Sequence, residues 1–302
     1  MRKLITFSIF LLGEMAFAQE IINLKVKEHS PTNSEKITYA ATGEINMISQ
    51  VTEPSITIYL PEASKATGVA VILCPGGAMR ILGWNNDVLK MAKWLNERGI
   101  AAIGLKYRLM DNSQMPSTKD PSKPFGAAFK VEIQDFQNFN KANANPSTVP
   151  EGTDIVYKAA ADANEAIMEV RKHAQAWNID PNKVGFLGFS AGGGVAIAQT
   201  VLYTSEDSRP NFLAVNYGPS LIDVNVPQNA PPLFVCSNID HPNVAAGCMA
   251  LFMEWKKSQK NAEIHLFSGA TGGFRISKQG KPVDAWSELF LNWLVSAGIL
   301  KK

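Results

Sequence analysis

The sequence predicts an α/β fold in which helices cover both faces of a mainly parallel central sheet. Strand-like apolar runs alternate with amphipathic helical patterns over most of the chain, and the crossovers between them place successive strands parallel. The runs 68–74 and 184–189 are apolar without interruption, as is typical of strands buried on both faces. No internal repeat and no run of like charges divides the chain.

The first part of the chain predicts four elements before this alternation stops. Residues 55–60 alternate between polar and apolar side chains, and the helical spacing of residues 87–98 stops at Gly99. We therefore expect, in chain order, an outer strand at 55–60, a buried strand at 68–74, a helix at 87–98 and a strand at 100–109.

Residues 110–152 interrupt the pattern with repeated prolines among polar residues and with interleaved phenylalanines. A loop of this length in a compact domain is usually functional or disordered. Because it follows a strand, it leaves the sheet at the carboxyl edge, where such folds bind ligands. We interpret it as an insertion after one strand that forms a lid or lines the mouth of a site; a surface excursion without function is the alternative.

The second part of the chain returns to regular alternation. Residues 154–177 place alanine and aliphatic side chains on one helical stripe, and residues 284–299 place large aromatic and aliphatic side chains on one face. We expect a helix at 154–177, a strand at 183–189, a helix after Ser190, strands at 212–217 and 232–240, a helix near 244–257, a strand at 262–267 and a last helix at 284–299.

The N-terminus has the order of a secretory signal peptide: a basic start, the apolar run 4–12, and the tripeptide AFA at 16–18. The apolar run is too short to span a bilayer. A buried N-terminal helix is the alternative, and the basic residues Arg2 and Lys3 disfavour it. We expect a signal peptide at 1–18, a polar leader at 19–50, one domain at 51–302, and export to the periplasm or the cell exterior, with no membrane contact after cleavage.

Charge and cysteine content exclude several classes of partner. The formal net charge is +2, and loss of residues 1–18 lowers it to +1, so nothing electrostatic favours nucleic acid or an anionic membrane. Three cysteines, Cys74, Cys236 and Cys248, lie in apolar segments and predict small buried side chains, not a disulfide framework or metal site. No metal ion or organic cofactor is implied, and the sequence does not indicate an oligomeric state.

The pentapeptide GFSAG at 188–192 has the spacing of a nucleophile elbow. It follows an apolar strand and precedes an apolar helix, which is the structural context that this motif requires. Such a turn strains the backbone at Ser190, and glycines on either side leave room for it. A dinucleotide-binding loop is the competing interpretation, but the spacing is not G-x-G-x-x-G. We predict that Ser190 is a nucleophile and that the N–H of Ala191 donates to an oxyanion.

Two further groups lie at predicted strand ends. The segment CPGGA at 74–78 follows a buried strand, and its turn can aim the N–H of Gly77 or Ala78 at the same oxyanion; a plain β-turn is the alternative. Asp240 ends the second strand after the elbow strand, where the acid of a Ser–Asp–His order belongs. A helix cap or turn residue is the alternative for Asp240.

These segments resemble the α/β-hydrolase superfamily, specifically the secreted bacterial esterases related to acetyl-xylan and feruloyl esterases. The resemblance covers about residues 50–110 and 153–297 and implies an α/β-hydrolase fold, a nucleophile at Ser190, an acid at Asp240 and oxyanion donors after Cys74. The segments that carry it are GVAVILCPGGAMRILGWNNDVLKMAKWLNERGIAAIGLKYRL, AADANEAIMEVRKHAQAWNIDPNKVGFLGFSAGG, APPLFVCSNID and AEIHLFSGATGGF.

The chain departs from this family at its base. The family usually has GGHGF where this chain has ATGGF at 270–274, so Gly272 occupies the place of the catalytic histidine, and an EG pair where this chain has Asp87 and Val88. His241 follows Asp240 and offers at most a Ser–His dyad. The base is therefore unassigned. The other histidines are expected in a buried strand, on a solvated helix position and in the leader: His265, His173 and His29.

The sequence thus predicts a secreted serine hydrolase, in particular a carboxylic-ester hydrolase acting on acyl groups of carbohydrates or other small esters. The alternative is a hydrolase-fold binding protein with impaired or no catalysis, because glycine stands at position 272.

Overall fold

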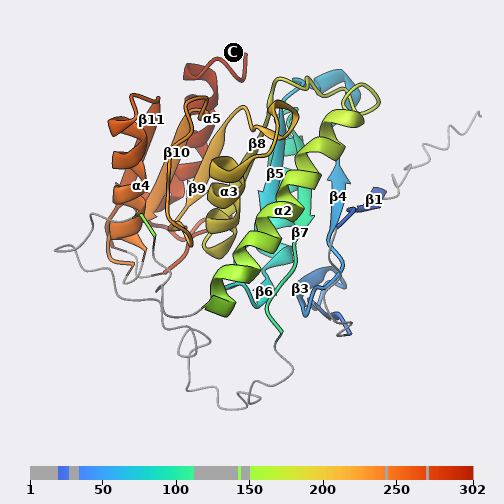
Figure 1. The fold of residues 1–302 in the computed structure, drawn as a ribbon. Coiled ribbons are helices and arrows are strands. Elements are labelled where there is room, and N and C mark those ends of the chain that lie inside the picture. Colours follow the sequence, from blue (N-terminus) through green and yellow to red (C-terminus); the bar gives the residue numbers. More distant parts are fainter. Residues whose placement is uncertain are drawn as a thin grey trace, which may run out of the picture.

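The computed structural model describes residues 20–26, 34–111, 142–143, 150–241, 244–269 and 272–301. An eight-stranded sheet forms its centre (Figure 1), in the order β1-β4-β7-β5-β8-β9-β10-β11. The strands from β7 to β11 in that order are parallel, whereas β4 is antiparallel to both of its neighbours, which confirms the mainly parallel central sheet. The strands are β1 (Glu20–Asn23), β4 (Ser55–Tyr59), β5 (Ala70–Cys74), β7 (Ala101–Lys106), β8 (Val184–Phe189), β9 (Leu213–Asn216), β10 (Leu233–Asn238) and β11 (Ala262–Phe267).

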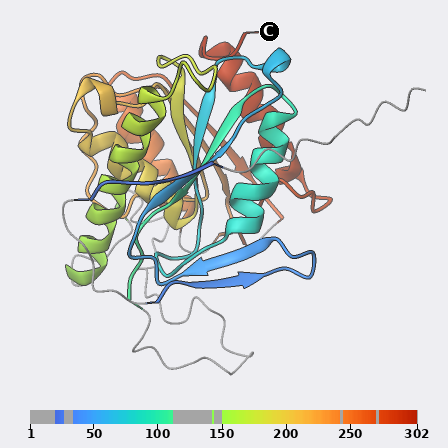
Figure 2. The same cartoon turned by 90° about the vertical axis from the view of Figure 1, so that its right-hand side faces the viewer.

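Helices cover both faces of this sheet (Figure 2). One face carries α2 (Pro150–Lys172), α3 (Ala191–Leu202) and α4 (Ala245–Lys257), and the other carries α1 (Lys90–Asn96) and α5 (Trp286–Ser296). Every residue of β5, β8, β9 and β10 is buried, as their uninterrupted apolar sequences predict. The sheet between two helix layers therefore holds the core.

A second, three-stranded sheet consists of β2 (Lys36–Tyr39), β3 (Ile45–Ser49) and β6 (Ile81–Leu82). It lies beside the carboxyl ends of the parallel strands, at the lower edge of the molecule in Figures 1 and 2. Residues 19–50, the predicted leader, thus contribute strands to both sheets. The expectation that 55–60 form the outer strand is wrong, because β1 pairs along β4 and covers it.

Element boundaries differ from the sequence prediction at three helices. A π-helical turn at Asn85–Leu89 precedes α1, and a 3₁₀ turn at Pro282–Ala285 precedes α5. Helix α2 begins at Pro150, because proline has no N–H to leave unpaired in a first turn. The last residues of the predicted insertion 110–152 therefore belong to α2.

Most of the predicted insertion lies outside the described residues, as do the predicted signal peptide 1–18 and His29. Its described part is anchored to the carboxyl edge. Asn143 forms a β-bridge with Ser220, and its Nδ2 donates to Asp223 Oδ1 at 2.9 Å. The insertion therefore returns to the sheet edge beside β9, and the lid remains a prediction.

A buried ion pair joins the end of β7 to α2 and gives a stability test. Arg108 Nη2 lies 2.7 Å from Asp162 Oδ1, and the two side chains are 4% and 0% exposed. Asp162→Ala leaves the guanidinium buried without its carboxylate, so we expect a loss of about 3–5 kcal/mol in the free energy of unfolding. Urea unfolding measures this loss.

The matched control removes an exposed pair on the same helix. Lys172 Nζ lies 2.8 Å from Glu169 Oε1, with the lysine side chain 65% exposed, so Lys172→Ala should cost less than about 1 kcal/mol. Equal losses in the two variants would contradict the role given to Asp162.

Candidate active site

Ser190 occupies the turn between β8 and α3 with φ 51° and ψ −124°. A positive φ at a residue other than glycine is strained and marks sites where the surrounding structure holds it in place. The N–H of Ser190 donates to Asn216 O at 3.0 Å, which ties the turn to the end of β9. The half-buried side chain of Ser190 makes no hydrogen bond with any residue that the structure describes. The predicted elbow therefore has the strained geometry that its sequence indicates.

The turn after β5 lies against this elbow. A methyl group on Gly192 would lie 2.1 Å from Cys74 O, and one on Gly76 would lie 3.1 Å from Ser190 Cβ. Neither position accepts a larger residue without movement of the backbone. The two turns, predicted separately from the sequence, therefore pack together at the carboxyl edge.

The two turns also present backbone N–H groups as hydrogen-bond donors. The N–H groups of Gly77, Ala78 and Ala191 have no acceptor among the described residues. Gly77 and Ala78 have φ of 143° and 54°, so the chain leaves β5 in a conformation that ordinary turns avoid. Free N–H groups at a helix start stabilise negative charge. The three donors named by the sequence thus lie in the two turns that flank Ser190, and their role stays a prediction.

Asp87 is a functional candidate that the sequence analysis did not identify. It lies in the π-helical turn before α1 and is 3% exposed. Its Oδ2 accepts the N–H of Gly76 at 2.9 Å, so the carboxylate holds the turn after β5 from behind. Burial raises the pKa of Asp87 to about 6, although the Gly76 N–H and Arg275 act in the opposite direction. The sequence signal available was the position itself, where the resembling family has glutamate.

Arg275 reaches Asp87 from the loop after β11. Its Nε lies 3.4 Å from Asp87 Oδ1, and its side chain is half exposed. This pair joins the loop that contains Gly272 to the turn that lies against Ser190. Nothing in the sequence pattern indicated a contact between residues so far apart in the chain.

Asp240 and Gly272 lie at the same edge, in the order that a triad requires. Asp240 is exposed beyond the end of β10, and its Oδ2 accepts the N–H of Gly269 at 3.2 Å. The carbonyl of Gly272 accepts a hydrogen bond from Asn238 Nδ2. A Cβ on Gly272 would meet nothing within 4 Å, and its φ is outside the left-handed region. The loop therefore has room for the side chain that glycine lacks.

His241 lies at the same edge but makes no hydrogen bond with Ser190. Its ring stacks on Tyr217, with centroids 6.3 Å apart and planes 15° apart. Nδ1 is buried and has no partner in the described part of the chain, and burial lowers the pKa of the imidazole. β10, which precedes His241, is separated from β8 by β9. The structure thus brings His241 beside Tyr217 without joining it to Ser190 by a hydrogen bond.

The other described histidines lie away from the elbow. His265 is in β11 at the edge of the sheet and contacts Glu263 Oε1 through Nε2 at 2.7 Å. It is half-buried, less covered than the sequence predicted, because an edge strand has a neighbour on one side only. His173 stacks on Trp177 with ring centroids 4.9 Å apart. Neither histidine contacts Ser190.

Tyr217 lies between His241 and the loop after β11. It follows β9, is buried and has φ 41°. Its ring packs edge-on against Phe274 with centroids 4.7 Å apart, and a methyl on Gly273 would lie 2.8 Å from its Cε2. The loop after β11 therefore rests on this aromatic ring.

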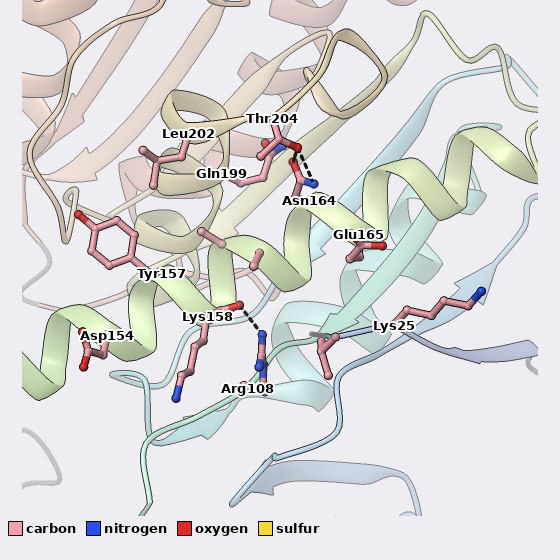
Figure 3. Close-up of a pocket in the computed structure, with 13 residues that line it drawn as sticks. Lys25, Arg108, Asp154, Tyr157, Lys158, Asn164, Glu165, Gln199, Leu202 and Thr204 are labelled. Atoms are coloured by element: carbon pink, nitrogen blue, oxygen red, sulfur yellow. Dashed lines mark hydrogen bonds between the residues drawn. The ribbon is translucent and has the colours of Figure 1, made fainter. Parts of the chain in front are cut away.

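A separate cavity of about 660 Å³ lies between α2 and α3 (Figure 3). Tyr157 and Asn164 of α2 and Gln199 of α3 line it. Gln199 lies in the last turn of α3, whereas Ser190 precedes its first, so this cavity is distinct from the elbow. Within the described ranges, no cluster of three metal-binding side chains occurs, and no helix has the length and apolar character of a membrane span.

Comparison with known proteins begins with solved structures. A carboxylesterase from Lactobacillus plantarum superposes with a TM-score of 0.61 at 16% identity, covering 94% of this chain and 99% of that one. An acetyl ester-xyloside bifunctional hydrolase from Caldicellulosiruptor lactoaceticus gives 0.59 at 23% identity, covering 82% and 89%. An α/β hydrolase from a deep-sea metagenome library gives 0.60 at 18% identity, covering 92% and 98%.

The chain has the α/β-hydrolase fold. Sequence comparison adds a similarity to esterases. The BD-FAE family model matches residues 138–230. An acetylxylan esterase from Xylanibacter ruminicola is 29% identical over 159 residues, which cover 53% of this chain. The match spans about a quarter of the length of that curated relative, 24%.

Proposed function

We propose that the protein is a carboxylic-ester hydrolase that uses Ser190 as its nucleophile. The single observation that carries this proposal is the strained turn at Ser190, which is flanked by N–H groups without acceptors in the described residues. A hydroxyl on such a turn is presented to a substrate, and the N–H groups meet the charge that develops on a carbonyl oxygen. The esterase names of the sequence relative and the structural neighbours support the same reaction class.

The reaction proceeds in two steps. Ser190 Oγ attacks the ester carbonyl, and the N–H groups of Ala191 and of Gly77 or Ala78 hold the resulting oxyanion. The alcohol leaves, and water then releases the acid from the acyl-enzyme. Asp240, at the end of β10, is the acid that would orient a base placed on the loop after β11. The proposed steps are written with neither a metal ion nor an organic cofactor.

The substrate class follows from the relatives. We propose acyl groups on carbohydrates or on other small esters, because the curated relative is an acetylxylan esterase and one structural neighbour is an acetyl ester-xyloside hydrolase. Export through the N-terminal signal, to the periplasm or beyond the cell, fits a substrate of plant polysaccharide type. The substrate class and the export are both part of the proposed function.

A second candidate function is a binding protein on the same fold. The observation that favours it is Gly272, which supplies no imidazole, together with the lack of a hydrogen bond between Ser190 and any described histidine. The free N–H groups would then bind an anionic or carbonyl group without turning it over.

Ser190→Ala tests the nucleophile. The variant should lose covalent labelling by a fluorophosphonate probe and all hydrolysis of p-nitrophenyl acetate above background, because both need the hydroxyl. Its melting temperature should stay nearly unchanged, since the Ser190 hydroxyl makes no hydrogen bond with a described residue.

Ser205→Ala is the matched control, an exposed serine that should label and hydrolyse like the parent. A parent that neither labels nor hydrolyses esters would favour the binding protein instead.

Gly272→His tests the missing imidazole. The open space around position 272 accepts the ring, so acetyl-ester hydrolysis should rise at least about tenfold, a cautious fraction of what a triad member contributes. Steady-state kinetics measure the gain, which should vanish when Ser190→Ala is added. Gly272→Ala is the control for filling the space without an imidazole. A gain in that control equal to that of histidine would assign the effect to loop packing.

A further inference from the structure

The side chains of Asp87 and Ser190 face the same glycine. A methyl group on Gly76 would lie 3.1 Å from Ser190 Cβ and 3.4 Å from Asp87 Oδ2, so these two atoms are at most about 6.5 Å apart. Because Gly76 carries no side chain, no Cβ stands between the carboxylate and the serine. An upper limit of this size is compatible with proton transfer through one water molecule.

Asp87 retains an unused acceptor. Oδ2 accepts the Gly76 N–H, whereas Oδ1 is buried and has no hydrogen-bond partner in the described structure. Buried carboxylate oxygens normally have a hydrogen-bond partner, so a carboxylate with one oxygen that lacks such a bond is a candidate for a functional group. Arg275 Nε lies 3.4 Å from Oδ1 and forms an ion pair with it, and this guanidinium lowers the pKa of Asp87.

None of the titratable groups described around Asp87 carries a negative charge that would oppose its ionisation near neutral pH. Tyr107 and Tyr217, the residues directly after β7 and β9, interact with it, and burial keeps the pKa of both phenols well above their usual value, so neither carries charge. The Tyr107 hydroxyl donates to Pro75 O at 2.6 Å. Among the described residues, Arg275 supplies the positive charge that lowers the pKa of Asp87, and burial has the opposing and larger effect.

We propose that Asp87 is the general base of Ser190, in place of the imidazole that Gly272 does not provide. This inference rests on the proposed esterase function. It assigns the proton acceptor within that reaction, and it can fail while the esterase function stands.

The proton balance is complete without another reactant. As the Oγ–carbon bond forms, the Ser190 proton passes to the Asp87 carboxylate, and the carbonyl electron pair moves to the oxyanion. Protonated Asp87 then gives the proton to the departing alkoxide as the ester bond breaks. In the second step Asp87 accepts a proton from water, hydroxide adds to the acyl carbon, and Ser190 recovers its proton when the acid leaves.

Asp87→Asn keeps the side-chain volume and an oxygen for the Gly76 N–H but removes the base. We expect kcat/KM for p-nitrophenyl acetate to fall about 10²–10⁴-fold. In Asp87→Ala, added formate should restore at least about a tenth of the lost rate, because it enters the vacated space as a carboxylate. Asp162→Ala, which removes the carboxylate from the Arg108 pair, is the matched control and should show no formate effect.

The pH profile separates a base from a structural carboxylate. In the parent, log kcat/KM should fall as pH drops through about 6, because protonated Asp87 cannot accept the serine proton. Arg275→Gln removes the charge that lowers the pKa of Asp87, so the descending limb should move to higher pH. A limb that stays in place would overturn the assignment, even if the Asp87 variants are too unstable to assay.

A double variant gives the decisive arm. An imidazole at position 272 replaces the base, so Gly272→His should restore activity in the Asp87→Asn background. If Asp87 only supports the oxyanion turn, histidine at 272 will not compensate for its loss, and the proposal fails. Undiminished activity in Asp87→Asn overturns the base assignment alone, whereas a parent without labelling at Ser190 overturns the esterase function itself.

Discussion

The arrangement of backbone around Ser190 depends on the close contact between the elbow and the turn after β5. A methyl group on Gly192 would lie 2.1 Å from Cys74 O and 2.5 Å from Pro75 O, so only glycine allows the two backbones to meet. Parallel pairing of β5 with β8 brings the ends of both strands to the same level, with Cys74 opposite Gly188. The free N–H groups of both turns thus lie beside one serine because the sheet register puts them there.

Two buried side chains hold this contact from behind. Asp87 accepts the Gly76 N–H, and the Tyr107 hydroxyl donates to Pro75 O. Hydrogen bonds to a charged acceptor stabilise more than neutral ones, and both groups are shielded from water. Asp87 therefore has two roles in the structure: one oxygen shapes the turn through the Gly76 N–H, and the other is buried without a hydrogen bond and forms an ion pair with Arg275.

The sequence predicted those parts of the fold that local patterns encode. Uninterrupted apolar runs located β5 and β8, and the glycine spacing located Ser190, because burial on both faces and a strained turn each leave a local signature. The strands β1, β2 and β3 were not predicted, because they are short and partly or fully exposed. Only their pairing with distant segments defines them. The contact between Asp87 and Arg275 was not predicted for the same reason, because it joins segments that no sequence pattern connects.

Burial distinguishes the two carboxylates at this edge, Asp240 and Asp87. Asp240 is exposed, and its carboxylate is held by a backbone N–H of the loop instead of by an imidazole. Solvent screens a charge in that position, so by itself it adds little to proton transfer across the mouth. Asp87 is enclosed, and burial brings the pKa of its carboxyl to about 6, close to that of a free imidazole. A carboxylate in that environment matches the proton affinity of histidine without needing a second acid to orient it. Under the proposal made above, glycine at position 272 removes one candidate base from this edge, and Asp87 remains as another, bonded to the N–H of Gly76 in the turn after β5.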